Sequence, residues 1–253
     1  MHMREQIHTI PVNEAFDAHD ECPFCFMERK VERSAIRFVT GPGASYMEPD
    51  VRGATDRAGF CVHHMQKLYT YGNSLGNGLM LQTYLACFLE DFQREKEAFV
   101  MPEKKPLFGK RKQPASDDPY WKRLREKVDS CYICDKIEYN MSRYYRTFFT
   151  LLKEPEFREK VEGSKGFCLR HFSRMLEEAE EHLPNAQREW FYPMVFNLME
   201  TNLLRIKEDI DWFTAKFDYR NANAPWKNSQ DAVQRTMQKL EGLYPADKPY
   251  KSE

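Results

Sequence analysis

The chain has 253 residues with 38 basic and 39 acidic side chains, which give a formal net charge of −1. Hydrophobic residues make up 42% and charged residues 30%, a composition typical of one large globular domain or two smaller ones. No apolar run approaches the roughly 18 residues that a membrane-spanning helix needs. Residues 1–12 also lack the apolar core of a signal peptide. We therefore expect a cytoplasmic protein without a membrane partner.

The first half of the chain is expected to be helical. A helix over residues 13–39 ends where Gly41 begins a Gly-Pro-Gly turn, and a short helix follows Pro49. A long helix is predicted at about residues 76–100, because apolar residues recur there every three or four positions. This stripe comprises Leu81, Tyr84, Leu85, Phe88, Leu89 and Phe92. Cys87 lies on the same apolar face and is expected to pack in the core as a small apolar side chain.

A basic segment follows. Residues 103–127 hold 9 basic and 4 acidic side chains, and residues 103–118 also contain prolines and a glycine, which is typical of an exposed linker. The basic side chains are Lys104, Lys105, Lys110, Arg111, Lys112, Lys122, Arg123, Arg125 and Lys127. Nucleic-acid-binding modules usually have a larger basic surplus and a dedicated reading element. A solvated linker is therefore the main expectation, with nucleic-acid binding through it a weaker alternative.

The second half repeats the helical pattern. A short helix is expected at residues 121–128, an apolar helical stripe runs from Ile137 to Leu152, and a long helix is predicted at about 186–217. Ser229 is a suitable N-cap for a last helix that ends at Gly242. No segment alternates β-branched and polar residues as a strand would. The sequence therefore predicts an all-α fold.

A cysteine and histidine motif occurs twice. Each copy reads Cys-x2-Cys, then a gap, then Gly-Phe-Cys-x2-His, and the gap measures 36 positions from Cys25 to Cys61 and 34 from Cys134 to Cys168. This duplication predicts two tandem, similar helical repeats. The expected boundaries are 1–102 for the first repeat, 103–118 for the linker, 119–217 for the second repeat and 218–253 for a tail with a short helix.

Three thiolates and an imidazole are a donor set that suits a tetrahedral metal ion. The predicted ligands are Cys22, Cys25, Cys61 and His64 in the first repeat, and Cys131, Cys134, Cys168 and His171 in the second. His64 is preferred to His63 because His63 aligns with Arg170, which cannot bind a metal. Pairing within each repeat is the expectation, while an arrangement in which the two sets interleave across the repeats stays open.

Two Zn²⁺ ions per chain are the predicted cofactors, with an iron–sulfur cluster as the alternative. Each copy supplies four good ligands, and a metal site with no open position is structural rather than catalytic. If the cysteines bind no metal, they pack as buried apolar residues. Their reduced state is expected in the cytosol, where metal binding is favoured over disulfides.

No common catalytic motif is present: the sequence has no P-loop, dinucleotide-binding glycine pattern, His-Glu-x-x-His or nucleophile elbow. The leading hypothesis is a non-enzymatic zinc-binding module that interacts with a protein or a small ligand. The alternative is an iron–sulfur or thiol-based redox sensor or electron carrier. A possible polar site is predicted from two clusters of charged and aromatic residues, with Glu48, Asp50, Arg52, Asp218 and Arg220 as its members.

Several segments together resemble a bacterial family of unknown function that occurs widely in Firmicutes. They are Ile10–Phe16, Glu21–Cys25, Tyr46–Arg52, Gly59–His64, Lys216–Arg220 and Pro225-Trp226. The resemblance covers nearly the whole chain. It implies a cytoplasmic bacterial protein and carries no activity, so the interpretation of the cysteines depends on their spacing alone.

Overall fold

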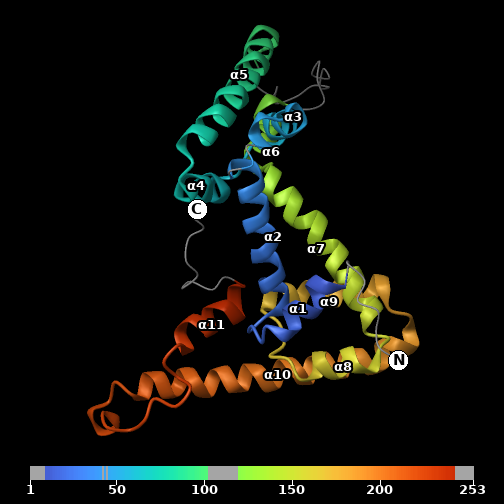
Figure 1. Ribbon diagram of the computed structural model, residues 1–253, viewed down its shortest axis with the longest axis vertical. Helices are drawn as coiled ribbons and strands as arrows, with labels where there is room; N and C mark the ends of the chain where they lie inside the picture. The colour runs from blue at the N-terminus through green and yellow to red at the C-terminus, as the bar shows by residue number, and fades with distance from the viewer. Residues whose placement is uncertain (1–8, 42, 44, 102–118, 243–253) are drawn as a thin grey trace, which may run out of the picture. The chain divides into compact units, whose positions relative to one another are not determined.

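The computed structural model describes residues 9–41, 43, 45–101 and 119–242. The regular structure of these residues is entirely helical, which confirms the predicted fold class (Figure 1). The α-helices are α1 (Ile10–Asp17), α2 (Pro23–Thr40), α3 (Pro49–Ala58), α4 (Val62–Tyr71), α5 (Ser74–Ala98), α6 (Tyr120–Asp129), α7 (Tyr132–Leu151), α8 (Pro155–Glu162), α9 (Leu169–His182), α10 (Asn185–Ala215) and α11 (Ala232–Glu241). Two 3-10 turns are η1 (Ser45–Met47) and η2 (Tyr219–Asn221). The predicted linker, residues 103–118, lies outside the described residues.

Local sequence explains where several helices begin. Proline occupies the first turn of α3 and of α8, where its missing N–H costs no hydrogen bond. Asn73 caps α5, because its side chain accepts a hydrogen bond of 2.9 Å from the N–H of Gly76. The prediction that Ser229 caps the last helix is wrong. Its hydroxyl donates instead to the carbonyl of Trp226, and α11 begins after Asp231.

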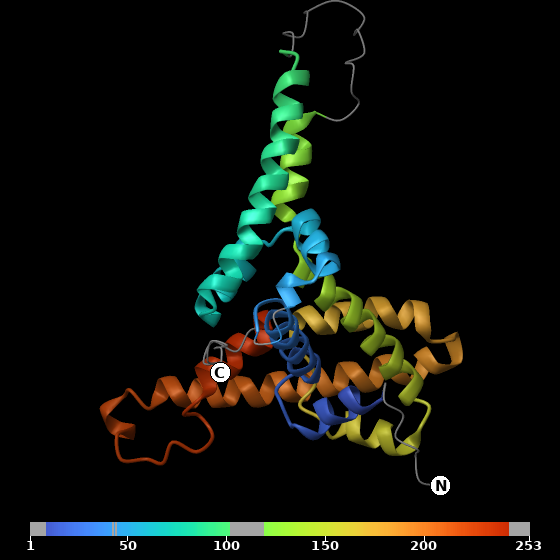
Figure 2. The ribbon, with the colours of Figure 1, turned by 45° about the horizontal axis from the view of Figure 1, so that its top comes forward.

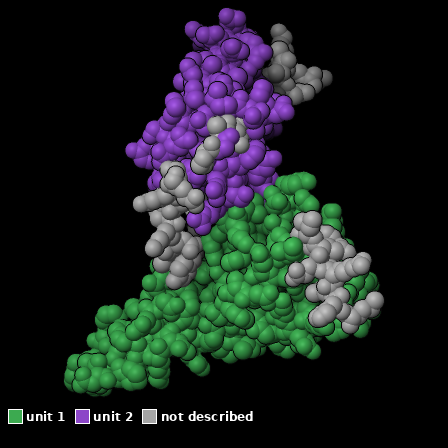
Figure 3. Space-filling view, in the orientation of Figure 1, with its two compact units in different colours: residues 1–31, 138–248 green, residues 32–137, 249–253 purple. Residues whose placement is uncertain are grey.

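The chain forms two compact units that do not follow the predicted repeat boundaries (Figure 3). Unit 1 contains the described residues up to Val31 and from Glu138 onward, whereas unit 2 contains the described residues from Glu32 to Ile137. The division therefore falls inside α2 and inside α7. Each of these helices begins in one unit and ends in the other, so each unit combines segments of both predicted repeats.

The core of unit 1 is aromatic. Phe24 of α2 stacks on Tyr145 of α7 with ring centroids 4.3 Å apart, and Phe148 contacts Phe24 edge-on. Phe167, directly before α9, also meets the ring of Phe24 edge-on at 5.8 Å. Edge-to-face and offset-stacked pairs of this kind add about 0.5–1.5 kcal/mol beyond the burial of their surface. They fix the first turn of α2 against α9, where four of the predicted metal ligands lie.

The core of unit 2 is mostly aliphatic. Ile36 and Val39 of α2 pack with Leu68 of α4, Met80 of α5 and Ile133 of α7, all of them buried. Helices α5 and α6 lie side by side (Figure 2), and an ion pair between Glu95 and Arg123 joins them. These contacts bring the N-termini of α4 and α7 into one small core.

Most of the predicted stripe on α5 is exposed, although Tyr84 and Phe88 are partly buried. The structure exposes Leu81 by 40%, Leu85 by 56%, Leu89 by 47% and Phe92 by 41%, and these four residues are called the α5 row below. Cys87 is exposed as well, so the prediction that it packs in the core is wrong. Helix α5 contacts α3 and η1, and Phe92 also meets the ring of Tyr120 of α6 with centroids 6.3 Å apart. Periodicity identifies an apolar face but not whether another element covers it.

Candidate metal centres

Four of the predicted ligands meet in unit 1, and they form centre 1: Cys22, Cys25, Cys168 and His171. Cys22 directly precedes α2 and Cys25 lies in its first turn, while Cys168 is the N-cap of α9 and His171 lies one turn later. All four are buried, and their ligand atoms lie within 4.8 Å of one another. The Sγ atoms of Cys25 and Cys168 are 3.6 Å apart, and Nδ1 of His171 lies 3.2 Å from Sγ of Cys168.

The other four meet in unit 2 and form centre 2: Cys61, His64, Cys131 and Cys134. Cys61 is the N-cap of α4, and Cys131 directly precedes α7. Nδ1 of His64 lies 3.3 Å from the sulfurs of Cys61 and Cys131 and 3.4 Å from that of Cys134. Each centre thus has the composition Cys3His, and each can hold a metal ion.

The pairing of the ligands corrects the expectation that each repeat closes its own site. The Cys-x2-Cys pair of one copy meets the Cys-x2-His pair of the other copy, so the two sets interleave. The reason lies in α2 and α7, which both start at a Cys-x2-Cys pair and then carry the chain into the other unit. In each copy, the Cys-x2-His pair therefore belongs to one unit and the Cys-x2-Cys pair to the other.

Both histidines are held between thiols and a carboxylate. Nδ1 of each ring faces the sulfurs, and Nε2 faces a glutamate of α2: it lies 3.1 Å from Glu32 at His64 and 3.4 Å from Glu28 at His171. A carboxylate on the second ring nitrogen fixes the orientation of a metal-binding histidine and makes it a better ligand. His63 is about half exposed, and it is not among the four residues whose ligand atoms meet in centre 2. The preference for His64 agrees with this geometry.

These two glutamates were not identified from the sequence, although a signal was present. Glu28 follows Cys25 by three residues and Glu32 follows it by seven, a spacing that places all three on one face of a helix. The side chains have further partners that hold them in place. Lys67 donates to both oxygens of Glu32 at 2.6 Å, and Arg170 makes a two-pronged contact with Glu28.

The pKa of the histidine is raised in both centres. Burial lowers the pKa of His64, but hydrogen bonds with Cys131 and Glu32 outweigh burial and raise the pKa to about 10. Burial raises the pKa of Cys131, yet hydrogen bonds from His64 and from backbone amides bring it down to about 6. In centre 1, burial is likewise outweighed, here by the negative charge of Cys22, and the pKa of His171 rises to about 10. A metal ion binds thiolates and a neutral imidazole, so metal binding in either centre would release the proton of the histidine.

The glycine of each Gly-Phe-Cys segment has a positive φ, +64° at Gly59 and +73° at Gly166. With its ψ of −156°, Gly59 occupies a region that is open essentially to glycine alone. The carbonyl of Gly59 also accepts a hydrogen bond of 2.9 Å from the N–H of Tyr132. This glycine therefore lets the chain turn into α4. Its hydrogen bond with Tyr132 joins the segment before α4 to the start of α7.

Helix α11 closes one side of centre 1, which the sequence did not indicate. The carbonyl of Gly242 lies 3.0 Å from the sulfur of Cys25. Lys239 is 1% exposed and donates to the carbonyls of Glu21 and Lys165 at 2.6 and 2.7 Å. Burial lowers the pKa of Lys239, and the charge of Glu21 acts in the opposite direction. Helix α11 and Gly242 therefore lie against centre 1.

The members of the predicted polar site are divided between the two units. Glu48, Asp50 and Arg52 belong to unit 2, whereas Asp218 and Arg220 belong to unit 1. Arg52 donates to the carbonyl of Tyr46 at 3.3 Å, and Arg220 pairs with Asp218 at 2.6 Å on the surface. These are local contacts that hold a loop and a turn in place.

The basic residues have ordinary partners where the structure describes them. Arg123 pairs with Glu95, and Lys127 donates to the carbonyls of Asp56 and Arg57 at 3.0 and 2.6 Å. Lys104, Lys105, Lys110, Arg111 and Lys112 lie outside the described residues.

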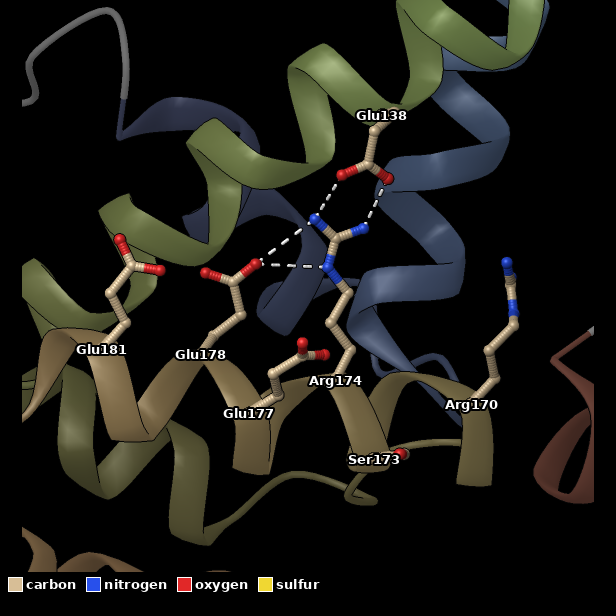
Figure 4. A pocket seen from close by; sticks show the side chains of 7 residues that line it. All are labelled: Glu138, Arg170, Ser173, Arg174, Glu177, Glu178 and Glu181. Atoms are coloured by element: carbon tan, nitrogen blue, oxygen red, sulfur yellow. Dashed lines mark hydrogen bonds and ion pairs between the residues drawn. The ribbon is translucent and has the colours of Figure 1, made fainter. Parts of the chain in front are cut away.

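A shallow pocket of about 370 Å³ lies on unit 1 beside centre 1 (Figure 4). Its central group is Arg174 of α9, which donates two hydrogen bonds of 2.6 Å to Glu138 of α7 and a third, of 3.2 Å, to Glu178. The lining therefore joins α7 to α9 through ion pairs that satisfy the arginine.

No described helix is both long enough and apolar enough to cross a membrane. No solved structure matches the chain. A similar protein is the "Uncharacterized 23.9 kDa protein in xynA 3'region" of Caldicellulosiruptor sp. (strain Rt8B.4), a Firmicute. It is 22% identical over 205 residues, which cover 80% of this chain and 85% of the relative. The model of a family of unknown function, DUF6062, matches residues 3–247, and the chain belongs to this family.

Proposed function

We propose that each centre binds one zinc ion and that the protein is a non-enzymatic, zinc-stabilised module for protein interaction. The observation that carries the zinc assignment is the meeting of three sulfurs and one imidazole nitrogen within 4.8 Å in each unit. All eight ligands come from the chain itself, and four protein ligands leave a tetrahedral zinc ion without an open position. A closed site of this kind supports a structural role.

The separations of the ligand atoms support a single ion in each centre. Zinc–sulfur bonds of about 2.3 Å and zinc–nitrogen bonds of about 2.0 Å in a tetrahedron place two sulfurs about 3.8 Å apart and a sulfur and a nitrogen about 3.5 Å apart. The sulfur pairs Cys25–Cys168 and Cys61–Cys134 measure 3.6 and 3.9 Å. An iron–sulfur cluster holds several irons and sulfides between its cysteines. Cysteine sulfurs that bind different irons of a cluster lie farther apart than the 4.8 Å within which all four ligand atoms of each centre meet, so this geometry favours zinc over the iron–sulfur alternative.

Zinc at these positions would join segments that are distant in the sequence. Cys25 and Cys168 are 143 positions apart, and Cys61 and Cys134 are 73 positions apart. Zinc binding in small sites is worth on the order of 10–16 kcal/mol, comparable with the total stability of a domain, which is about 5–15 kcal/mol. Metal binding can therefore decide whether α9 docks on α2 in unit 1 and whether α4 docks on α7 in unit 2.

The α5 row supports the interaction role. Its four apolar side chains are 40–56% exposed and lie at helical spacing on one face. Contiguous exposed apolar surface on a folded protein often marks a site of interaction. A hydrophobic dye that fluoresces on apolar surfaces should bind the folded protein, and a Leu85→Ser/Leu89→Ser variant should bind much less. Equal dye binding by the two proteins would contradict the interaction role of this surface.

The zinc assignment is tested by elemental analysis of protein purified anaerobically without added metal. We expect about two zinc ions per chain, no absorption near 400 nm, and loss of helical signal after treatment with a strong chelator. Cys87→Ser is the matched control, because Cys87 is exposed and belongs to neither centre. It should retain both zinc ions, while Cys25→Ser and Cys131→Ser should each lose at least one. Stoichiometric iron with visible absorption would overturn the assignment.

A further inference from the structure

The two centres differ in their access to solvent. All four ligands of centre 1 are buried, and its cysteines are at most 1% exposed. In centre 2, His64 and Cys131 are buried, but Cys61 is partly exposed and Cys134 is exposed. The two solvent-facing sulfurs are also neighbours, 3.9 Å apart. Centre 2 therefore presents an accessible pair of thiols, and centre 1 does not.

We propose that centre 2 is a site of reversible oxidation by hydroperoxides, in which Cys134 reacts first, a disulfide forms with Cys61 and the zinc of centre 2 is released. The proposal rests on the proposed zinc binding and adds regulation to it. Exposure and thiolate character together decide which cysteine an oxidant attacks. Metal coordination keeps all three sulfurs of the centre as thiolates. Exposure then distinguishes Cys134 from the buried Cys131.

The chemistry balances with hydrogen peroxide as the oxidant. The Cys134 sulfur attacks one peroxide oxygen, the O–O bond breaks, and hydroxide leaves as Cys134 becomes a sulfenic acid. The Cys61 thiolate then attacks the sulfur of this group, an S–S bond forms, and a second hydroxide leaves. Two thiolates have lost two electrons, the peroxide has gained them, and two protons from solvent convert the hydroxides to water. His64 and Cys131 alone would then remain as ligands, too few to hold a zinc ion that had four.

The geometry is suited to this disulfide. A disulfide bond is about 2.05 Å long, so the sulfurs of Cys61 and Cys134 need to approach by about 1.9 Å from their separation of 3.9 Å. Cys61 precedes α4 and Cys134 lies in the first turn of α7, so the new bond would replace the zinc as a link between these two helices. The disulfide would keep α4 linked to α7 after the zinc has left. A thiol reductant can break it again by thiol–disulfide exchange, so the change is reversible. Centre 1 would keep its zinc because its sulfurs are shielded.

The experiment uses the full-length Cys87→Ser protein, because Cys87 is exposed and would otherwise be oxidised as well. The zinc content is measured first, and hydrogen peroxide is then added while a chromogenic chelator records zinc release. Samples are alkylated at intervals and mapped by mass spectrometry. We expect one zinc per chain to leave at least tenfold faster than the other. The first disulfide should join Cys61 to Cys134, and dithiothreitol with zinc should restore the original content.

The outcomes separate this proposal from the zinc assignment. If the purified protein lacks two zinc ions per chain, both are overturned. Three results would overturn the oxidation proposal alone. They are release of both zinc ions at equal rates, no release of zinc by peroxide, and first oxidation at Cys22, Cys25 or Cys168. A His63→Ala variant of the same protein should behave like its parent, because His63 lies beside centre 2 but is not one of its four ligands.

Discussion

His64 lies between the sulfurs of centre 2 and the carboxylate of Glu32, with its Nε2 3.1 Å from Oε1 of that residue. Its Nδ1 is thereby directed at Cys61 and Cys131. The same arrangement recurs in centre 1, where Glu28 faces the other side of His171. Helix α2 therefore supplies the Cys25 thiol to centre 1 and one orienting carboxylate to each centre, and Cys22 directly precedes this helix.

Replacement of His64 should remove the metal of centre 2. We expect His64→Ala to bind one metal ion per chain instead of two, because three cysteines alone leave the fourth position open. The matched control is His63→Ala, which removes the adjacent imidazole and should keep both ions. Elemental analysis of the two variants decides the point, and loss of metal from His63→Ala alone would contradict the assignment.

The orienting carboxylates should tune metal affinity without binding the metal. Glu32→Gln should weaken binding at centre 2, and Glu28→Gln should weaken binding at centre 1, each by about 10- to 100-fold. Competition with a chelator of known affinity measures the change. Glu138→Gln serves as the control because Glu138 pairs with Arg174, whereas the ligand histidines pair with Glu32 and Glu28. Unchanged affinity in both test variants would show that the histidines hold their orientation without these carboxylates.

Gly59→Ala should destabilise unit 2. An added Cβ would lie 2.6 Å from the hydroxyl oxygen of Tyr84 and 2.8–2.9 Å from its ring, and the backbone conformation is one that only glycine adopts readily. Strain of this kind costs on the order of 1–3 kcal/mol. Gly53→Ala in α3 is the control: its Cβ would meet only the end of Arg57 at 3.4 Å, and alanine favours a helix over glycine by up to about 1 kcal/mol. Thermal and denaturant unfolding should move in opposite directions for the two variants.

Two substitutions in α5 distinguish its buried and exposed faces. Met80 is 2% exposed, and Met80→Ala should reduce the free energy of unfolding by about 2–5 kcal/mol. Leu85 is 56% exposed, and Leu85→Ser should change it by less than about 0.5 kcal/mol. If Leu85→Ser proves as damaging as Met80→Ala, the α5 row is part of a core after all.

The ion pair between Glu138 and Arg174 should give a small pH dependence. The hydrogen bonds from Arg174 are the main cause that holds the pKa of Glu138 below its usual 4.5. A carboxyl with a lowered pKa stabilises the fold above its unfolded pKa, and this contribution disappears as the pH falls through the lower, folded pKa. Glu138 is largely exposed, so Glu138→Gln should cost less than about 1 kcal/mol at pH 7 and nothing near pH 2.

Denaturant unfolding of the wild type and of Glu138→Gln across this pH range measures that difference. Glu177→Gln removes an equal charge from the same pocket and leaves the contact between Glu138 and Arg174 intact (Figure 4). Its stability relative to the wild type should show a weaker pH dependence. A constant difference between wild type and Glu138→Gln from pH 7 to pH 2 would show that the charge of Glu138 contributes nothing.

The sequence by itself determined the helical fold and the eight residues that gather in the two centres. Both follow from local geometry: helical periodicity covers a few turns, and two residues three positions apart at the start of a helix, such as Cys61 and His64, face one point. The motif glycines also belong to this local level, because a positive φ constrains one residue.

Only the tertiary structure decided which Cys-x2-Cys pair meets which Cys-x2-His pair. Across a gap of about 35 residues, a Cys-x2-Cys pair can meet the Cys-x2-His pair of its own copy or that of the other copy. The sequence does not distinguish these two pairings, because the choice depends on how α2 and α7 pack. The same reason applies to Glu28 and Glu32, whose histidines lie on other helices, and to the α5 row, whose exposure depends on what covers it. The duplicated motif thus specified the ligands, and the packing of two long helices decided that each centre takes half of its ligands from each copy.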